Sequence, residues 1–269
     1  MNDVLDQIIA HKRQEVAQRR QRTPMEELRE RAAAMPRPRN FFRAVTTPTR
    51  KRLNVIAEVK KASPSAGVIR QDFDPVAIAR TYEQAGADAL SVLTDEKFFQ
   101  GHLDYIAAVR QAVKLPVLRK DFIIDPYQVY ETRAAGADAV LLIAECLEIS
   151  QLIDLQILAT ELNMTCLIEV HDMENLIRVR DRVIGFPHPG YSLLGINNRD
   201  LRTFVTDIGT TLRLAELVED RGVLVSESGI ATAGDVRKLE AAGIRAVLVG
   251  ETLMRCGDVK ATMQELFGP

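Results

Sequence analysis

Polar and charged side chains follow five short apolar runs in this 269-residue chain, at the points where the runs end. Glu58 and Lys60 close the first run, two residues apart and therefore on one face of an extended strand. The later runs end at Lys120, Glu169, Asn197 and Glu227. Burying an unpaired carboxylate or ammonium is costly, so these charges indicate mutual pairing, ligand binding or both. A single such charge would suit a structural ion pair between strand and helix, whereas several that converge favour a catalytic site.

Glycine-containing turns follow the last two apolar runs. Ser228 and Gly229 follow one run, and Gly250 and Glu251 follow the next, where a short helix is expected to begin. Exposed backbone N–H groups at such turns, together with the helix dipole, form anion sites. One glycine after a strand can be turn geometry alone, but the paired occurrence predicts a phosphate-binding site.

The elements that must position these residues form a repeat. Eight apolar runs, four to eight residues long and rich in Val, Ile and Leu, alternate with stretches of helical periodicity such as 75–85, 127–135, 148–162 and 233–242. The runs span 53–60, 88–94, 115–119, 138–144, 164–170, 192–197, 222–227 and 245–250. Nearly continuous apolar strands between helices predict a parallel sheet that helices cover.

The number and spacing of the units indicate how the sheet closes. The units recur about every 25 residues, and the sequence AGADA stands at both 85–89 and 135–139. Eight units predict an α/β fold, a (β/α)8 TIM barrel, with a doubly wound open sheet as the alternative. In a barrel the carboxyl ends of the strands share one mouth, so the polar strand ends meet there.

The N-terminal 52 residues differ from the rest of the chain. They hold 13 Lys and Arg against 6 Asp and Glu, a net charge of +7, which leaves −9 for the remainder. Helical spacing predicts two amphipathic helices before Pro36, the second with a capping box at 23–26. We expect residues 1–52 to be an N-terminal helical extension packed on a barrel of residues 53–269, as one domain. Packed, solvated helices are favoured over a nucleic-acid patch because no aromatic residues are interleaved with the charges.

Composition excludes several classes of protein. Hydrophobic residues at 46% and charged residues at 27% are typical of folded globular proteins. The apolar runs fall short of the roughly 18 residues of a membrane helix, and a net charge of −2 argues against nucleic-acid binding overall. Three separated cysteines and four histidines without ligand spacing predict no disulfide framework and no metal site, and a cytoplasmic protein. His171 is interpreted as capping or solvating the following helix.

Seven strings in order along the chain carry a family resemblance. They are IAEVKKASPS at 56–65, SVLTD at 91–95, FFQG at 98–101, LRKDF at 118–122, LIEVH at 167–171, GINNRDL at 195–201 and VSESGI at 225–230. Through them the chain resembles the indole-3-glycerol phosphate synthase family over essentially its full length. The resemblance implies conversion of 1-(2-carboxyphenylamino)-1-deoxyribulose 5-phosphate into indole-3-glycerol phosphate, CO₂ and water, without a metal or an organic cofactor. It also implies that the N-terminal extension lies over the mouth.

The resemblance further implies roles for the polar strand ends. Lys120 matches a lysine that acts as general acid on the substrate carbonyl, and Glu169 a general base. Glu58 and Asn197 match residues that orient the lysine and the substrate, and Lys60 a second lysine for phosphate binding or dehydration. The division of acid and base work between Lys120 with Glu169 and Lys60 with Glu58 stays open.

Other matched positions concern binding of the substrate. Glu227 and Ser228 match contacts to its hydroxyl or carboxylate groups. The phosphate positions are Ser63, Gly229, Gly250 and Glu251. The pocket for the aromatic ring is matched by Phe99, Phe122, Leu93 and Leu141, with Arg199 as a supporting ion-pair residue.

Two alternatives remain beside this hypothesis. Another phosphosugar barrel, such as phosphoribosylanthranilate isomerase, would share the phosphate turns but use a Cys/Asp pair, and no cysteine convincingly ends a strand. The second alternative is a non-enzymatic protein, either a phosphometabolite sensor or an RNA-binding protein that uses the basic extension. RNA binding would depend on the salt concentration. We expect a phosphorylated small-molecule substrate, no nucleic-acid or membrane partner, and a monomer.

Overall fold

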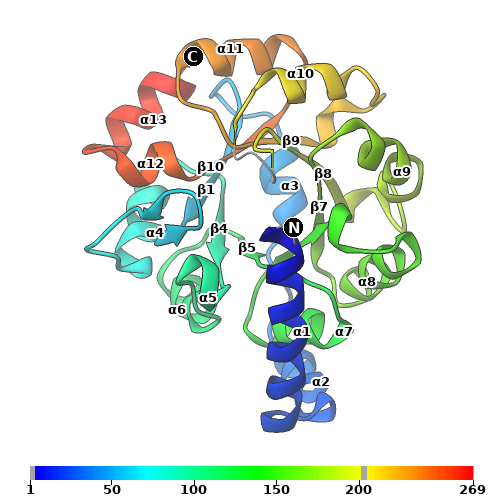
Figure 1. Cartoon of the computed structure of the whole chain (residues 1–269). Coiled ribbons are helices and arrows are strands. Elements are labelled where there is room, and N and C mark those ends of the chain that lie inside the picture. The colour runs from blue at the N-terminus through cyan, green and yellow to red at the C-terminus, as the bar shows by residue number, and fades with distance from the viewer. Residues whose placement is uncertain (1–3, 201–204, 269) are drawn as a thin grey trace.

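Eight parallel strands form a closed barrel in the computed structural model, which describes residues 4–200 and 205–268 (Figure 1). The strands are β1 (Asn54–Val59), β4 (Ala89–Leu93), β5 (Val117–Lys120), β6 (Ala139–Ile143), β7 (Thr165–Val170), β8 (Ser192–Asn197), β9 (Leu224–Glu227) and β10 (Ala246–Val249). β1 pairs with β10 on one side and β4 on the other, so the ring has no free edge. The TIM barrel is confirmed, and the open-sheet alternative is wrong because the sheet closes. Leu201, in one matched string, lies outside the described residues.

Helices surround the strands on the outside of the ring (Figure 1). They include α4 (Pro75–Gln84), α5 (Glu96–Phe99), α6 (Asp104–Ala112), α7 (Pro126–Ala134), α8 (Ile149–Glu161), α9 (Met173–Val183), α10 (Gly209–Ala215), α11 (Ala233–Ala241), α12 (Glu251–Arg255) and α13 (Val259–Phe267). Asp74 and Asp125 begin α4 and α7: each carboxylate accepts a backbone N–H of the first turn, ahead of a proline at the first helical position. Local sequence therefore defines where these helices begin.

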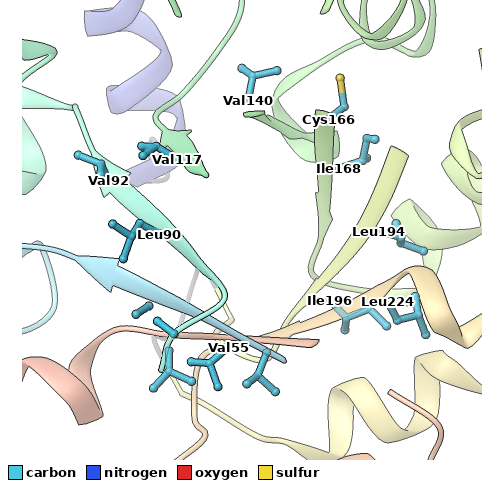
Figure 2. Packing of buried hydrophobic residues seen from close by; sticks show 14 of the residues in the cluster. Val55, Leu90, Val92, Val117, Val140, Cys166, Ile168, Leu194, Ile196 and Leu224 are labelled. Atoms are coloured by element: carbon cyan, nitrogen blue, oxygen red, sulfur yellow. The ribbon is translucent and has the colours of Figure 1, made fainter. Parts of the chain in front are cut away.

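Strand residues alternate between two separate apolar clusters. Val55 and Ala57 of β1 face outward into the cluster between strands and helices, and Figure 2 shows residues of this cluster on neighbouring strands. Ile56 faces inward, into a second cluster that fills the barrel. Because side chains alternate with a period of two, Glu58 and Lys60 share the inward side of Ile56. The same period places four more site residues inward, each two positions after an inner-cluster residue: Lys120 after Leu118, Glu169 after Leu167, Glu227 after Val225 and Gly250 after Leu248.

The N-terminal segment reaches both ends of the barrel. α1 (Val4–Arg22) begins near the centre of the view in Figure 1, where its first turns line the mouth, and runs outward beside α7. α2 (Met25–Ala34) packs on α7, and α3 (Phe41–Thr46) lies under the floor, the end at which the strands start. Phe41 and Val45 of α3 are fully buried in the inner cluster. The side chain of Asn54, at the start of β1, donates hydrogen bonds to the carbonyls of Val45 and Thr47.

Three local features differ from the sequence-based expectation. The capping box at 23–26 is wrong: Pro24 itself is the N-cap of α2, and no side chain bonds to the first turn. α3 is an additional helix, and a short hairpin of β2 (Ala62–Ser63) and β3 (Gly67–Val68) follows β1. Such short elements carry too few residues for a periodic pattern. No helix in the described ranges is both long and apolar enough to cross a bilayer.

Candidate active site at the barrel mouth

A cavity of about 480 Å³ opens at the carboxyl ends of the strands. Its volume lies within the range typical of small-molecule sites. All of the site residues expected from the sequence line it: Glu58, Lys60, Ser63, Leu93, Phe99, Lys120, Phe122, Leu141, Glu169, Asn197, Arg199, Glu227, Ser228, Gly229, Gly250 and Glu251. The barrel thus brings together residues that are up to 193 positions apart in the chain.

Lys120 lines the cavity at the end of β5, between two buried carboxyl groups. Its Nζ is 2.7 Å from Glu169 Oε2 and 3.3 Å from Glu227 Oε2, and its side chain is only 14% exposed. Burial by itself would lower the pKa of Lys120, but Glu169, Glu227 and Glu58 together outweigh it and hold that pKa above its ordinary value. The ammonium therefore stays protonated, as a proton donor to a substrate oxygen requires.

The pKa values of the two carboxyl groups beside Lys120 are shifted in opposite directions. Burial raises the pKa of both; at Glu169 the Lys120 ammonium and His171 outweigh burial and hold the pKa below its ordinary value. At Glu227 burial and the neighbouring Glu169 charge prevail over Lys120, so its pKa lies well above the ordinary value. Environments that separate the pKa values of neighbouring groups mark acid and base roles. Of the two, Glu169 favours the carboxylate form, which can accept a proton, and Glu227 keeps its proton to higher pH.

A second ion pair stands on the neighbouring wall. Lys60 Nζ lies 2.5 Å from Glu58 Oε1, and the two side chains are 15% and 4% exposed. Gly250 packs against this pair so closely that an added Cβ would overlap Glu58 Oε1 and stand 3.2 Å from Lys60 Nζ. A side chain at position 250 would therefore have to displace the Glu58 carboxylate. The contact also places Lys60 beside the turn after β10.

The turn after β9 is bent sharply toward the cavity. Ser228 and Gly229 both have positive φ, 65° and 76°, which is unusual for a serine. Asn198 holds this turn, because its side-chain amide donates to the Ser228 carbonyl and to Ser226 Oγ. No role for Asn198 was expected from the sequence, although the amide pair at 197–198 was a signal for it.

Arginines offset the carboxylate at the neighbouring turn. Arg199 Nη2 lies 3.4 Å from Glu251 Oε2 and its Nη1 3.3 Å from Ser65 Oγ, which joins the β2–β3 hairpin to the site. Arg255 Nε is 2.9 Å from Glu251 Oε1. Two cations therefore compensate the charge of Glu251, and an anion at this side of the cavity would meet guanidinium groups as well as backbone N–H groups.

The remaining wall is apolar. The Phe99 and Phe122 rings lie 6.1 Å apart between centroids, with Leu93 and Leu141 nearby on the cavity lining. The resemblance implied an N-terminal extension over the mouth, but the sequence did not indicate which residues of α1 line the cavity; they are Val4, Leu5 and Ile8. These residues belong to the apolar stripe of α1, but periodicity alone does not tell which surface a stripe covers.

The residues on either side of Lys120 form a separate, buried ion cluster. Arg119 Nη2 is 2.9 Å from Asp121 Oδ2, and Asp121 Oδ1 is 2.9 Å from Lys12 Nζ of α1. The side chains of all three are fully buried. The two interpretations of the charged strand ends, a catalytic site and a structural ion pair, therefore apply to alternate residues. Lys120 faces the cavity, and Arg119 faces the helices.

His171 does not cap the following helix, contrary to expectation. The N-cap of α9 is Asp172, whose carboxylate accepts the backbone N–H of Asn175. His171 lies instead behind Glu169, with 7% of its side chain exposed. In 4–200 and 205–268, no three His, Cys, Asp or Glu side chains are grouped so that they could hold a metal ion.

Solved structures that resemble this chain show the fold. A 3-hexulose-6-phosphate synthase aligns with a TM-score of 0.61 at 15% sequence identity, covering 80% of this chain and 98% of that one. A thiamine phosphate pyrophosphorylase from Pyrococcus furiosus aligns with a TM-score of 0.57 at 18% identity, covering 81% of this chain and 95% of that one. At such low identity these structures support the barrel alone.

Sequence relatives establish the family. The model of the family described as indole-3-glycerol phosphate synthase matches residues 5–266. A relative of that name from Rhodopirellula baltica is 51% identical over 264 residues, and one from Geobacillus kaustophilus is 51% identical over 267. These matches cover 98% of this chain in both cases, and 98% and 97% of the relatives. The resemblance seen in the seven strings is confirmed, and the chain belongs to the indole-3-glycerol phosphate synthase family.

Proposed function

We propose that the mouth of this barrel closes the indole ring of indole-3-glycerol phosphate, with Lys120 as the general acid. Membership of the family assigns the chain the decarboxylating lyase reaction, in tryptophan biosynthesis, on a phosphorylated small-molecule substrate. The observation that carries the proposed role of Lys120 is its position at 2.7 Å from Glu169 and 3.3 Å from Glu227. These carboxyl groups outweigh burial and hold the pKa of Lys120 above its ordinary value, so the ammonium stays charged until a substrate oxygen takes its proton.

The polarity of the cavity walls orients the substrate. The apolar wall of Phe99, Phe122, Leu93 and Leu141 suits the carboxyphenyl ring. The opposite side, with Arg199, Lys60, Ser63 and the turns at Gly229 and Gly250, suits the phosphate. The ribulose carbonyl between these ends then lies near Lys120. This orientation brings the aromatic carbon that bears the carboxylate toward the carbonyl carbon.

The chemistry then proceeds in three steps. Lys120 donates a proton to the carbonyl oxygen as the new carbon–carbon bond forms, which neutralises the developing alkoxide. Loss of CO₂ leaves its bonding electrons in the ring. The new hydroxyl group then takes a second proton, from Lys60 or from reprotonated Lys120, and leaves as water. Glu169 accepts the proton that the ring carbon next to the nitrogen releases, which completes the indole. We propose that Glu58 and Asn197 orient Lys120 and the substrate. Glu227 and Ser228 contact the hydroxyl or carboxylate groups of the substrate.

The competing isomerase has no support in the cavity. None of Cys146, Cys166 and Cys256, all within the described part of the chain, lines it. Burial raises the pKa of the Cys146 and Cys166 thiols, so neither is a ready proton donor or nucleophile.

A fluorescence assay tests the proposed function. The carboxyphenylamino-deoxyribulose phosphate is added to the purified protein, and indole emission is followed over a background without tryptophan, since the sequence has none. We expect wild-type protein and the exposed control Lys238→Ala to form product, and Lys120→Ala to lose most of kcat while keeping its circular dichroism spectrum. Turnover by Lys120→Ala near that of the control would refute the role of Lys120. Action as a monomer in the cytoplasm, without nucleic-acid or membrane partners, stays a prediction.

A further inference from the structure

His171 is a buried titratable side chain that the reaction steps above do not use. It follows β7 directly, behind Glu169, and does not line the cavity. Its Nε2 lies 3.3 Å from Glu169 Oε1, and its Nδ1 lies 3.2 Å from Glu145 Oε2. Glu145 belongs to the short helix η1 (Ala144–Cys146), which follows β6. The imidazole thus bridges a carboxylate in the cavity and one behind it.

The bridge extends the contact of Lys120 into a row of alternating charge. Glu169 Oε2 faces Lys120 and Glu169 Oε1 faces His171, so each oxygen of this carboxylate has a cationic neighbour. Glu145 is itself held, because its Oε1 accepts the backbone N–H of His171 at 2.9 Å. The row therefore ends at the hydrogen bond between Glu145 and the backbone of His171, so that protein groups hold its members in place.

We propose that His171, held by Glu145, is a positioning residue that orients Glu169 and keeps it ionised for proton acceptance. This inference rests on the proposed role of Glu169 as the base. His171 touches no substrate. It acts through Glu169, by occupying the oxygen that faces away from Lys120 and leaving the other oxygen directed at the cavity.

The charges around His171 favour its protonated form. Burial alone would lower the pKa of the imidazole, but Glu145 and Glu169 outweigh it and raise that pKa above the ordinary value, with Lys120 opposing them. Glu227 lies beyond Lys120, and burial and the neighbouring Glu169 raise its pKa well above the ordinary value. The nearby Cys146 thiol stays protonated, because burial and the two ionised carboxylates raise its pKa.

A purely structural role for His171 fits the geometry less well. Neither ring nitrogen has a hydrogen-bond partner in good alignment within the described residues, although both approach a carboxylate oxygen within 3.3 Å. The contacts are therefore chiefly electrostatic, and a neutral side chain of similar size would fill the same space without supplying the charge. The first turn of α9 does not need the imidazole either, because Asp172 caps it.

Steady-state kinetics of His171→Gln and Glu145→Gln test the proposal. The matched control is His102→Gln, at a histidine whose side chain is 46% exposed and does not line the cavity. We expect kcat to fall roughly tenfold in both test variants, with KM changed less than about twofold, because misplacing a base affects chemistry before binding. We also expect the acid limb of the pH profile to move up by about one pH unit in His171→Gln, since Glu169 loses a cation. A folded His171→Gln protein with wild-type kcat and an unmoved acid limb would overturn the proposal, as would a loss confined to KM.

A titration of the wild-type imidazole by NMR provides a readout that does not depend on turnover. We expect His171 to titrate above the ordinary histidine value, and at lower pH in Glu145→Gln; titration below the ordinary value in the wild type would overturn the proposal even where the variants fail to fold. Glu169→Gln separates the two ideas. If it turns over normally, the proposed role of Glu169 fails; if it is inactive while His171→Gln behaves as wild type, only the present inference fails.

Discussion

Replacing Lys12 with methionine tests whether α1 is attached to the barrel by a buried charge. Lys12 Nζ lies 2.9 Å from Asp95 Oδ2 and 2.9 Å from Asp121 Oδ1, and 3.0 Å from Glu15 Oε2. Its side chain is fully buried, as are those of both aspartates. Asp95 Oδ2 has no hydrogen-bond partner among the described residues, so the ion pair compensates its charge. Methionine keeps the length and packing of the side chain and removes only the ammonium.

The expected loss of stability follows from the burial of these groups. Removing one partner of a buried ion pair costs about 3–5 kcal/mol, because the other charge stays buried without compensation. For a chain of this size 1 kcal/mol shifts Tm by roughly 2 °C, which predicts a fall of about 6–10 °C. Asp121 keeps Arg119 at 2.9 Å, so most of the loss comes from Asp95. Since the first turns of α1 line the cavity, we also expect a higher KM.

Thermal unfolding and steady-state kinetics measure both effects. The matched control is Arg13→Met, which removes a cation from the next residue of the same helix, where the side chain is exposed. We expect that control to stay within about 1 °C of the wild type. A Tm for Lys12→Met within the same margin would refute the reasoning, because the buried carboxylates would then not depend on Lys12. A large fall with the KM unchanged would refute only the link between α1 and substrate binding.

Three further outcomes are expected. Gly250→Ala should keep the fold but lower kcat/KM at least tenfold, because the methyl group displaces Glu58; refolding yield and kinetics check this. Gly195→Ala should also keep the fold and lower kcat/KM at least tenfold, because its methyl group would overlap the Glu227 carboxyl group. Wild-type kinetics in either variant would contradict the packing argument. Burial opposes ionisation of Asp121, but two buried cations hold its pKa well below the ordinary value, so its stabilising contribution is present above about pH 4 and lost as the pH falls. The free energy of unfolding should therefore decline in acid less steeply in Asp121→Asn than in wild type; equal slopes would contradict this.

Strand alternation explains why so much of the mouth could be located from the sequence. Glu58, Lys120, Glu169 and Glu227 stand at strand ends, and the inward or outward side of each follows from its parity with apolar neighbours. Parallel strands of one barrel necessarily end at the same mouth. Local pattern and the count of eight units were therefore enough to bring residues from distant positions into one site. Their chemical roles came only from the family resemblance.

Contacts between segments without a shared pattern could not be inferred in this way. Lys12 meets Asp121 across 109 positions, and the apolar stripe of α1 does not reveal that its first turns line the cavity. His171 was interpreted from its position just after a strand as capping or solvating the next helix, but the N-cap is Asp172. The contact of His171 with Glu145 depends on where η1 places a side chain after β6. Neither contact leaves a periodic signal.

The sequence by itself determined the barrel, the inward faces of its strands and the family, because periodicity, repeat number and local strings are properties of neighbouring residues. Only the tertiary structure decided the opposite pKa shifts of Glu169 and Glu227, the ion pairs that attach α1 and the position of α3 under the floor. These depend on burial and on charges brought within about 3–4 Å from distant segments, where removal of water makes electrostatic interactions strong. Such distances exist only once the chain has folded.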